Sequence, residues 1–215
     1  MHYTSVLFDL DGTLLDTLGD LTAAMNHTLT RHGLPERTRQ QMRAALGNGA
    51  RRLMELSVPA GTDGALFETL LAEYNADYAA HCRMETAPYP GVDALLRQLH
   101  AQGRKLAIVS NKPDEAVRAL RAEFFADTVP IAVGEKQGIR RKPAPDTLLA
   151  AMAQLGAERT STVYVGDSEV DIATARAAGL PCISVLWGFR DRDLLEQAGA
   201  QQFAADAGEL ARLLD

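Results

Sequence analysis

The architecture expected for this chain follows from one N-terminal run, Val6-Leu7-Phe8-Asp9-Leu10-Asp11-Gly12-Thr13-Leu14-Leu15-Asp16-Thr17. Its first three residues are apolar and predict a short buried strand. Asp9 stands where this strand should end, and Asp11 follows two positions later, so both side chains point the same way in an extended backbone. Two carboxylates this close cannot both ionise at low cost unless a cation lies between them.

Gly12 adds a second feature to this run. Glycine can adopt a positive φ, so the chain can turn sharply there and direct backbone N–H groups at an anion. Asp and Gly are also common turn residues, so the run taken alone fits an ordinary polar turn as well. The rest of the chain has to decide between the two interpretations.

Size and composition indicate an ordinary globular protein. The chain has 215 residues, of which 47% are hydrophobic and 23% charged, enough for one well-buried domain and a smaller one. The formal net charge of -6 argues against a protein that binds nucleic acid through a basic surface. Anionic substrates remain compatible with it, because a local pocket can be positive on an acidic protein.

The cysteines and the N-terminus indicate the compartment. Cys82 and Cys182 form no C-x-x-C pattern and have no paired histidines. This pattern indicates a protein of a reducing compartment, with neither a disulfide nor a zinc site. The first residues show neither a basic stretch nor a long apolar one, and no apolar run reaches the length of a membrane span. We therefore expect a cytoplasmic protein with neither signal peptide nor membrane segment.

After the first strand the sequence pattern becomes helical and stays so up to residue 83. Four helices are predicted: from residue 18 to the stop at Gly33, from a capping box at Thr38 to Gly47, over 50–58, and from a cap at Asp63 to about residue 82. No strand signal interrupts this block. We therefore predict an inserted all-helical domain over residues 15–83.

From Pro88 onward, strands and helices alternate. Strands are expected at residues 105–109, 131–133, 162–165 and 182–186, with helices between and after them. This alternation predicts an α/β fold, a doubly wound parallel sheet built from residues 1–14 and 84–215. In such sheets, ligands bind beyond the carboxyl ends of the strands.

Two of these strand ends carry groups suited to an anion. Ser110-Asn111 offers a hydroxyl and an amide just before a helix, although the pair could also be an ordinary helix cap. Lys142 lies in the basic run 140–142 and is followed by a proline that restricts its backbone. Such a run can be a solvated loop, but an ammonium held there could contact both a carboxylate and a phosphate.

The strand at 162–165 leads into a second acidic motif, Gly166-Asp167-Ser168-Glu169-Val170-Asp171. Asp171 follows Asp167 by four residues, so both carboxylates lie near one face of the helix that begins there. Asp167 or Ser168 could be a simple N-cap. The combination with the first run is more informative, because four carboxylates at one sheet edge could not all ionise without a cation. Oxygen ligands with no His or Cys among them predict Mg²⁺.

Four motifs occur in this order: Asp9-Leu10-Asp11-Gly12-Thr13, Ser110-Asn111, Lys142-Pro143 and Gly166-Asp167-Ser168-x-x-Asp171. Together they resemble the haloacid dehalogenase superfamily of phosphatases and phosphotransferases. The resemblance covers essentially the whole chain and implies a Rossmann-like core. The predicted helical domain stands where the family has an α-helical cap.

The resemblance also implies roles for these residues. Asp9 would attack phosphorus and become an aspartyl-phosphate, while Asp11 would protonate the leaving alcohol and then activate water. The implied Mg²⁺ ligands are Asp9, the backbone carbonyl of Asp11, Asp167 and, directly or as a supporting partner, Asp171. The groups implied to hold the phosphoryl oxygens are Ser110, Asn111, Lys142 and the N–H groups of Gly12 and Thr13.

Within the superfamily, Asp11 argues against the halide-releasing branch. The runs 15–17, 47–50 and 185–190 are most similar to phosphoglycolate phosphatases, which implies a small phosphorylated metabolite as the partner. Pyrophosphatases and sugar-phosphate phosphatases or phosphomutases share much of the pattern. Outside the superfamily, a phospho-accepting signalling module and a catalytically silent fold remain as alternatives.

The helical domain should set substrate specificity. We expect Asn48, Arg51 and Arg52 to bind a substrate carboxylate, although helical arginines are often simply exposed. The hinges of cap closure are expected near residues 14–18 and 84–90. The predicted partners include neither nucleic acid nor membrane, and the chain is expected to be a monomer or a weak homodimer.

Overall fold

The computed structural model describes residues 3–215, and residues 1 and 2 of the predicted core domain lie outside that description. The chain folds into two compact units. One unit, the α/β unit, combines the chain up to Leu15 with Pro88–Asp215. The other, the helical unit, is Asp16–Ala87.

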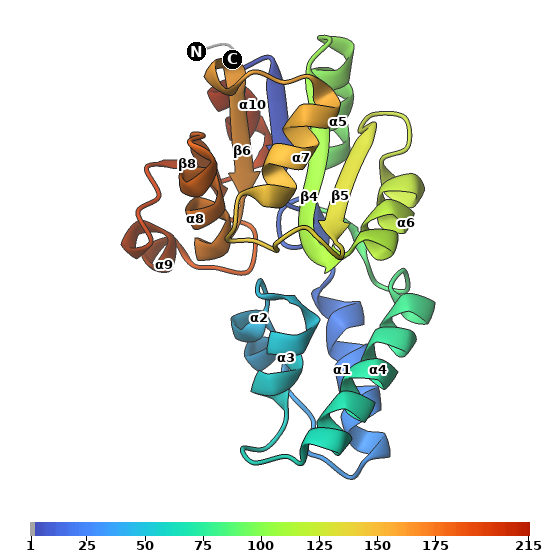
Figure 1. The fold of residues 1–215 in the computed structure, drawn as a ribbon. Coiled ribbons are helices and arrows are strands. Elements are labelled where there is room, and N and C mark those ends of the chain that lie inside the picture. Colours follow the sequence, from blue (N-terminus) through green and yellow to red (C-terminus); the bar gives the residue numbers. More distant parts are fainter. Residues whose placement is uncertain (1–2) are drawn as a thin grey trace. The chain divides into compact units, whose positions relative to one another are not determined.

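The α/β unit is built on a six-stranded sheet whose strand order is β5-β4-β1-β6-β7-β8 (Figure 1). Every pairing in it is parallel, which confirms the predicted doubly wound α/β fold. The strands are β1 (Ser5–Phe8), β4 (Lys105–Pro113), β5 (Ile131–Glu135), β6 (Thr162–Gly166), β7 (Cys182–Val185) and β8 (Gln202–Ala204). The central strand β1 is completely buried, as its apolar run predicts.

Helices cover both faces of this sheet. They are α5 (Val92–Ala101), α6 (Asp114–Phe124), α7 (Asp146–Leu155), α8 (Glu169–Ala178), α9 (Arg192–Gln197) and α10 (Ala207–Leu214), with a short 3₁₀ helix at Arg159–Ser161. Leu148 of α7 and Ala175 of α8 share one apolar cluster with Leu7, Val109 and Tyr164 of the sheet. Helices α5 and α10 contact each other and lie behind the sheet in Figure 1. After β1 the sheet grows on one side through β4 and β5, and the chain then crosses to the other side of β1 for β6, β7 and β8. This reversal makes the carboxyl end of β1 the switch point, where such folds bind ligands.

The main differences between the sheet and the prediction concern β4 and β8. Strand β4 continues to Pro113 instead of ending at Val109, because pairing with β5 is interrupted after Val109 and resumes at Pro113. Ser110 and Asn111 therefore lie within an irregular strand rather than in a loop. Strand β8 was not predicted, since only three residues pair with β7 there.

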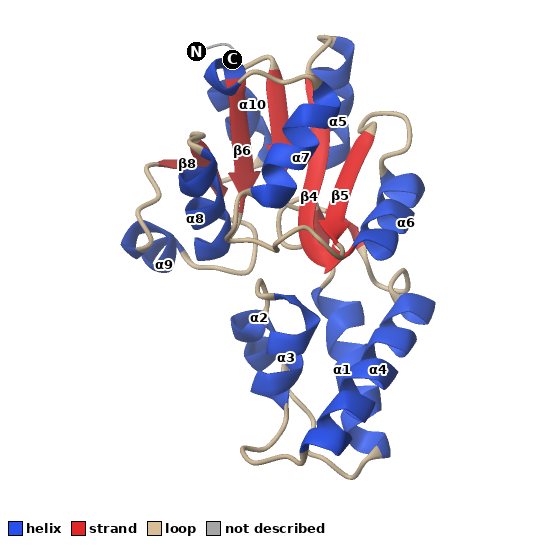
Figure 2. Ribbon diagram, in the orientation of Figure 1, coloured by secondary structure: helices blue, strands red, loops and turns tan. Residues whose placement is uncertain are grey.

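The helical unit contains α1 (Leu18–Arg31), α2 (Arg39–Ala45), α3 (Gly49–Ser57) and α4 (Gly64–His81) (Figure 2). These are the four predicted helices. The capping box at Thr38 is present, because its hydroxyl accepts the Gln41 N–H and its own N–H donates to the Gln41 side chain. Asp63 caps α4 by accepting N–H groups of its first turn.

The chain passes between the units through β2 (Leu15–Asp16) and β3 (Ala87–Pro88), which pair as a separate two-stranded sheet. Close to this crossing, Asp20 of α1 is buried and binds the segment that precedes β3. Its carboxylate accepts the N–H groups of Met84 at 3.1 Å, Glu85 at 2.8 Å and Thr86 at 3.0 Å, and the Thr86 hydroxyl at 2.7 Å. The segment 84–86 is thereby held to α1.

Over residues 3–215, no helix combines the length and the apolar character needed to cross a membrane.

Candidate active site

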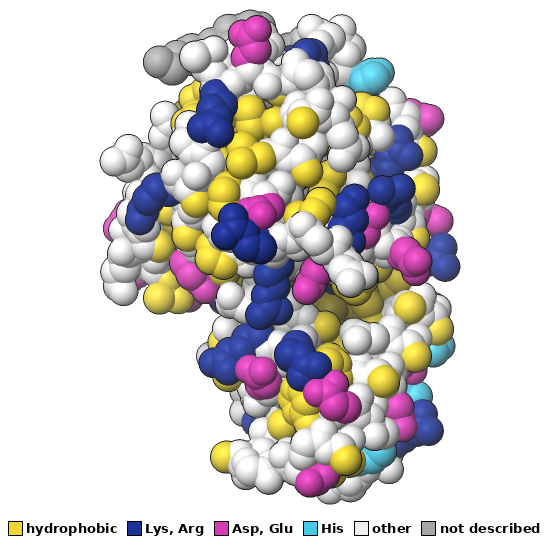
Figure 3. Space-filling view, viewed as in Figure 1, with side chains coloured by type: hydrophobic (Ala, Val, Ile, Leu, Met, Phe, Trp, Pro, Cys, Tyr) yellow, Lys and Arg dark blue, Asp and Glu magenta, His cyan; other side chains and the backbone are white. Residues whose placement is uncertain are grey.

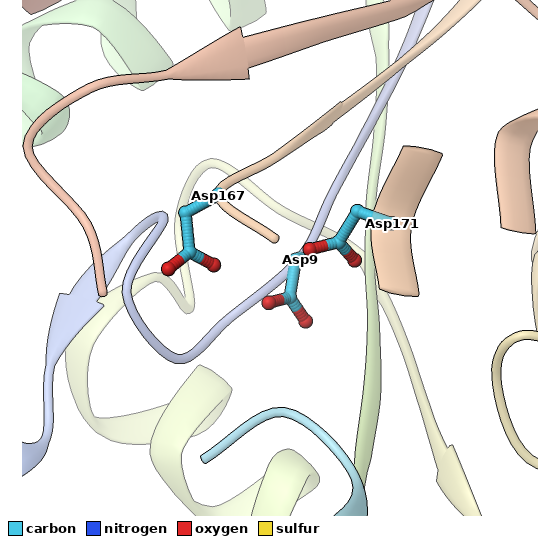
Figure 4. A group of neighbouring side chains, drawn as sticks. All are labelled: Asp9, Asp167 and Asp171. Carbon is cyan, nitrogen blue, oxygen red and sulfur yellow. The ribbon is translucent and has the colours of Figure 1, made fainter. Parts of the chain in front are cut away.

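Three carboxylates meet at the carboxyl end of the sheet. Asp9 follows β1, Asp167 follows the neighbouring strand β6, and Asp171 lies in the first turn of α8. Figure 4 shows them coming from three segments toward a common space, and one oxygen of each lies within 4.8 Å of the others. The residues are 6%, 1% and 0% exposed. Parallel pairing of β1 with β6 therefore brings together groups that are 158 to 162 positions apart, as the sequence predicts.

Lys142 enters this acidic cluster from the loop before α7. Its Nζ lies 2.7 Å from Oδ1 of Asp9, 2.7 Å from Oδ1 of Asp171 and 3.0 Å from the Tyr164 hydroxyl. Asn111 holds the backbone of Lys142, accepting its N–H at 2.8 Å and donating to its carbonyl at 3.1 Å. Asn111 thus positions the backbone of Lys142, and its predicted contact with a phosphoryl oxygen stays a prediction.

The burial of these charges shifts their titration. Burial, and then the charge of Asp171, raise the pKa of Asp9 well above its usual value, while Lys142 opposes that shift. Burial also works against the charge of Lys142, but Asp171 and Asp9 outweigh it and raise the pKa of the ammonium. Burial, followed by the same two carboxylates, raises the pKa of Tyr164. Lys142 stays charged and Tyr164 stays protonated at neutral pH.

Asp171 accepts hydrogen bonds on both of its oxygens. Oδ1 accepts from Lys142 and, at 2.9 Å, from the Tyr164 hydroxyl. Oδ2 accepts from the Ser168 N–H at 3.1 Å and the Ser168 hydroxyl at 2.6 Å. A carboxylate has about four acceptor positions, so these four donors occupy Asp171 and fix Lys142 next to Asp9.

Asp167 is enclosed by backbone. Its Oδ2 accepts the Phe189 N–H at 2.7 Å, and Thr13 Oγ1 lies 3.4 Å from its Oδ1. A Cβ atom added to Gly12 or to Gly188 would overlap the Asp167 side chain. Burial, followed by the charge of Asp171, raises the pKa of Asp167 to about 7, and the Phe189 hydrogen bond only partly opposes this.

Asp11 lies next to this cluster and contacts β4. Oδ1 of Asp11 is 2.9 Å from the Nζ of Lys112, and Ser110 Oγ is 3.5 Å from Oδ2. Gly12 has the positive φ expected for its turn, +84°. The N–H groups of Gly12 and Thr13 donate inside the loop, to the carbonyls of Leu15 at 2.9 Å and Leu10 at 3.4 Å. Their predicted use as anion donors therefore stays a prediction.

Residues 6–185 match the haloacid dehalogenase-like hydrolases. The chain belongs to this family. A phosphoglycolate phosphatase of Xanthomonas campestris pv. campestris is 37% identical over 187 residues, which are 86% of this chain and 84% of the relative. An N-acetylmuramic acid 6-phosphate phosphatase of Pseudomonas aeruginosa is 31% identical over 100% of this chain and 96% of its own length.

A solved structure supports the same placement. A protein of Lactobacillus delbrueckii subsp. bulgaricus, provisionally described as a phosphoglycolate phosphatase, superposes with a TM-score of 0.94 at 36% identity, covering 100% of this chain and 99% of its own. As a haloacid dehalogenase-like hydrolase with phosphatases as relatives, the chain is an enzyme, a phosphoric monoester hydrolase.

Part of this haloacid dehalogenase-like site was missed from the sequence. The sequence does not predict two contacts of the loop after β7: Trp187 Nε1 donates to the Thr13 carbonyl at 3.0 Å, and Arg190 pairs with Glu169 at 2.7 Å. Lys112 was not singled out either. A signal for it existed, because Lys112 stands two positions after Ser110, and such residues share a face in extended chain.

The arginines expected to bind substrate lie in the helical unit and contact carboxylates there. Arg51 forms a double hydrogen bond with Glu68, at 2.9 and 2.8 Å, and its guanidinium lies over the Phe67 ring. Arg52 pairs with Glu55 at 2.9 Å. Figure 3 shows basic and acidic side chains next to one another on the visible face of this unit. Asn48 precedes α3 as its N-cap residue. Their role in substrate binding stays a prediction.

Proposed function

We propose that this enzyme is an Mg²⁺-dependent phosphatase that hydrolyses a small phosphate monoester, 2-phosphoglycolate, through an aspartyl-phosphate on Asp9. The observation that carries the proposal is the buried ion pair of Asp9 with Lys142 beside Asp167. Asp9 is a nucleophile at a switch-point strand end, held in place by a fixed cation. This is the arrangement that covalent phosphoryl transfer needs.

The donor set fits a divalent cation. When all three are ionised, Asp9, Asp167 and Asp171 bring three negative charges and Lys142 one positive charge, which leaves two negative charges for a cation to balance in a buried space. The available ligands are carboxylate oxygens, which Mg²⁺ prefers. Asp9 and Asp167 would hold the ion, with Asp171 behind them because its oxygens already accept four donors. When bound, Mg²⁺ would neutralise charge on the phosphoryl group.

The residues of the chain divide the reaction between them. A carboxylate oxygen of Asp9 forms a bond to phosphorus while the bond from phosphorus to the ester oxygen breaks, and Asp11 gives its proton to that oxygen. Asp11 then takes a proton from water, which attacks phosphorus, releases inorganic phosphate and restores Asp9. Lys142, fixed by Asn111 and Tyr164, keeps Asp9 oriented throughout. The Ser110 hydroxyl binds a phosphoryl oxygen.

Similarity to named enzymes supports the choice of substrate. Phosphoglycolate phosphatases are among the relatives. N-acetylmuramic acid 6-phosphate is a second candidate, because the relative with that name matches the chain over its full length. We propose that the helical unit acts as the cap of the enzyme. The monomer or weak homodimer stays a prediction.

The test is phosphate release from a panel of esters, each with Mg²⁺ and with EDTA. The panel holds 2-phosphoglycolate, N-acetylmuramic acid 6-phosphate, hexose phosphates, pyrophosphate and an aryl phosphate. We expect Mg²⁺-dependent release that the Asp9→Asn variant lowers at least about 1,000-fold, with the highest kcat/KM for 2-phosphoglycolate.

Asp63→Asn is the matched control, because Asp63 is a carboxylate in a helix cap of the other unit. A higher kcat/KM for N-acetylmuramic acid 6-phosphate than for 2-phosphoglycolate would contradict the proposed substrate but not the proposed mechanism. A lasting phospho-enzyme after acetyl phosphate, without turnover of any ester, would contradict the phosphatase mechanism and favour a signalling module.

A further inference from the structure

We infer that Lys112 is the specificity residue of this site and selects phosphate esters whose leaving group carries a carboxylate close to the ester oxygen. The inference rests on the proposed function and deepens it. It names the feature of the substrate that is recognised and places that recognition in the α/β unit.

The position of Lys112 is the first observation. It lies in the irregular end of β4, where its N–H donates to Ser110 Oγ at 3.1 Å. Its ammonium is 2.9 Å from Oδ1 of Asp11, and the two side chains are only 10% and 17% exposed. Lysine is rarely this enclosed without a partner. The charge is therefore held at one place, next to the carboxyl group that handles the leaving-group proton.

The two lysines of the site have different surroundings. Lys142 donates to Asp9, Asp171 and Tyr164, which together account for the three N–H bonds of an ammonium. Lys142 therefore serves the nucleophile. Lys112 contacts the proton donor instead, on the side of the site where the leaving group has to lie.

Distances then limit what Lys112 can reach. A proton donor must approach the ester oxygen to about 3 Å. Nζ of Lys112 is 2.9 Å from Oδ1 of Asp11, so the ammonium lies within about 6 Å of that ester oxygen when Oδ1 is the proton donor and within about 8 Å when Oδ2 is. In 2-phosphoglycolate the carboxylate carbon is two bonds from the ester oxygen, so its own oxygens lie about 3 to 4 Å away. The ammonium can contact Asp11 and this carboxylate together.

Other esters lack this feature. A hexose phosphate has a neutral leaving group, and the carboxylate of N-acetylmuramic acid 6-phosphate lies many bonds from the ester oxygen. Since a charge-assisted hydrogen bond in a shielded site contributes more than one between neutral groups, Lys112 should favour the short carboxylate ester over both.

The test compares 2-phosphoglycolate with 2-hydroxyethyl phosphate, which has the same chain length but a neutral group in place of the carboxylate. We expect Lys112→Met to lower kcat/KM for 2-phosphoglycolate by about 10- to 100-fold, mainly through KM. The loss for 2-hydroxyethyl phosphate, which reports only the lost ion pair with Asp11, should be at least about 5-fold smaller, and Lys112→Arg should recover part of the preference for 2-phosphoglycolate. Lys105→Met is the matched control, because Lys105 opens the same strand at its exposed end.

Calorimetry gives a readout without turnover. Asp9→Asn and the double variant Asp9→Asn/Lys112→Met are titrated with both esters. We expect the second substitution to weaken binding of 2-phosphoglycolate selectively.

The outcomes separate the two proposals. Equal losses for both esters, or none, would overturn the role of Lys112 while leaving the phosphatase in place. A selective loss of affinity in a protein that releases no phosphate would support Lys112 and contradict the proposed reaction. Loss of the preference in Arg51→Met, with Lys112→Met unchanged, would move carboxylate recognition to the helical unit.

Discussion

The backbone N–H of Phe189 donates a 2.7 Å hydrogen bond to Oδ2 of Asp167. This bond ties the loop after β7 to the carboxylate at the end of β6. The same loop reaches the turn after β1, where Trp187 Nε1 donates to the Thr13 carbonyl at 3.0 Å. The loops that follow β1, β6 and β7 are thereby packed into one wall around Asp167. A substitution in one of these loops should therefore shift the position of Asp167.

Gly188 tests this packing. A Cβ atom there would overlap the Asp167 side chain and the Gly12 carbonyl oxygen. Because neither atom is the flexible end of a long side chain, we expect Gly188→Ala to destabilise the protein by about 1 to 3 kcal/mol. The Mg²⁺ concentration for half-maximal activity should also rise about 10-fold or more, measured by Mg²⁺ titration of phosphate release.

Gly64→Ala is the matched control. Gly64 is the first residue of α4, and an added Cβ would meet nothing within 4 Å. This variant should be neutral or slightly stabilised. A Gly188→Ala enzyme with the wild-type Mg²⁺ requirement would show that the wall does not position Asp167.

Removing the ammonium of Lys142 should be costly for stability as well as for activity. Lys142→Met would leave Asp9 and Asp171 buried without their counter-ion. We expect a loss of about 3 to 5 kcal/mol in the free energy of unfolding, measured by urea denaturation in EDTA.

Added Mg²⁺ should restore part of this stability but not the activity, because Asp9 also loses its orientation. Lys142→Arg keeps the charge but not the compact ammonium. Its stability and activity should lie between those of the wild type and those of Lys142→Met. If Lys142→Met is as stable as the wild type in EDTA, the ion pairs do not hold the site together.

The raised pKa values of Asp167, about 7, and of Asp9 predict a pH dependence. An acid whose pKa is higher in the folded than in the unfolded protein binds its proton more tightly when folded. Its stabilising contribution is present below about pH 4 and is lost as the pH rises toward 7. In EDTA, the free energy of unfolding of the wild type should therefore fall by a few kcal/mol relative to Asp167→Asn over this interval.

Mg²⁺ should reverse this trend, because the metal binds deprotonated carboxylates. The gain in melting temperature on adding Mg²⁺ should be larger at pH 8 than at pH 5.5, as measured by thermal denaturation. An equal gain at both pH values would mean that these carboxylates are not the ligands.

Asp20 should stabilise the return segment of the helical unit. Its carboxylate accepts four hydrogen bonds from residues 84–86, so Asp20→Ala leaves the buried N–H and hydroxyl of Thr86 without this partner and removes two further, part-buried bonds. We expect a loss of about 2 to 4 kcal/mol and faster amide exchange at residues 84–86, measured by hydrogen–deuterium exchange.

Asp63→Ala removes a carboxylate that caps α4 instead. It should cost about 1 kcal/mol and leave exchange at 84–86 unchanged. Unchanged exchange in Asp20→Ala would contradict the role assigned to Asp20.

Local features of this chain could be predicted from the sequence. The apolar run of β1 and the capping box of Thr38 and Gln41 were found because each depends on residues close in the chain. The meeting of Asp9, Asp167 and Asp171 was also predictable, since parallel strands place their carboxyl ends at one edge.

Features that depend on distant pairing could not be predicted. Strand β8 has three residues and becomes a strand only by pairing with β7. The ion pair of Lys112 with Asp11 depends on where the irregularity of β4 falls against its neighbours. The spacing of Asp167 and Asp171 likewise did not show that Tyr164, Ser168 and Lys142 would occupy the oxygens of Asp171.

The pairing of β2 with β3 has a consequence for how such a chain can be altered. The chain enters the helical unit at β2 and leaves it at β3, and these two strands pair with each other. The entry and exit points are therefore adjacent whatever the length of the inserted segment, and we expect that the helices between them can be replaced. A graft that joins at β2 and β3 changes the inserted module without re-threading the sheet, and leaves the register of β1 and β6, and so the meeting of Asp9 with Asp167, as it is.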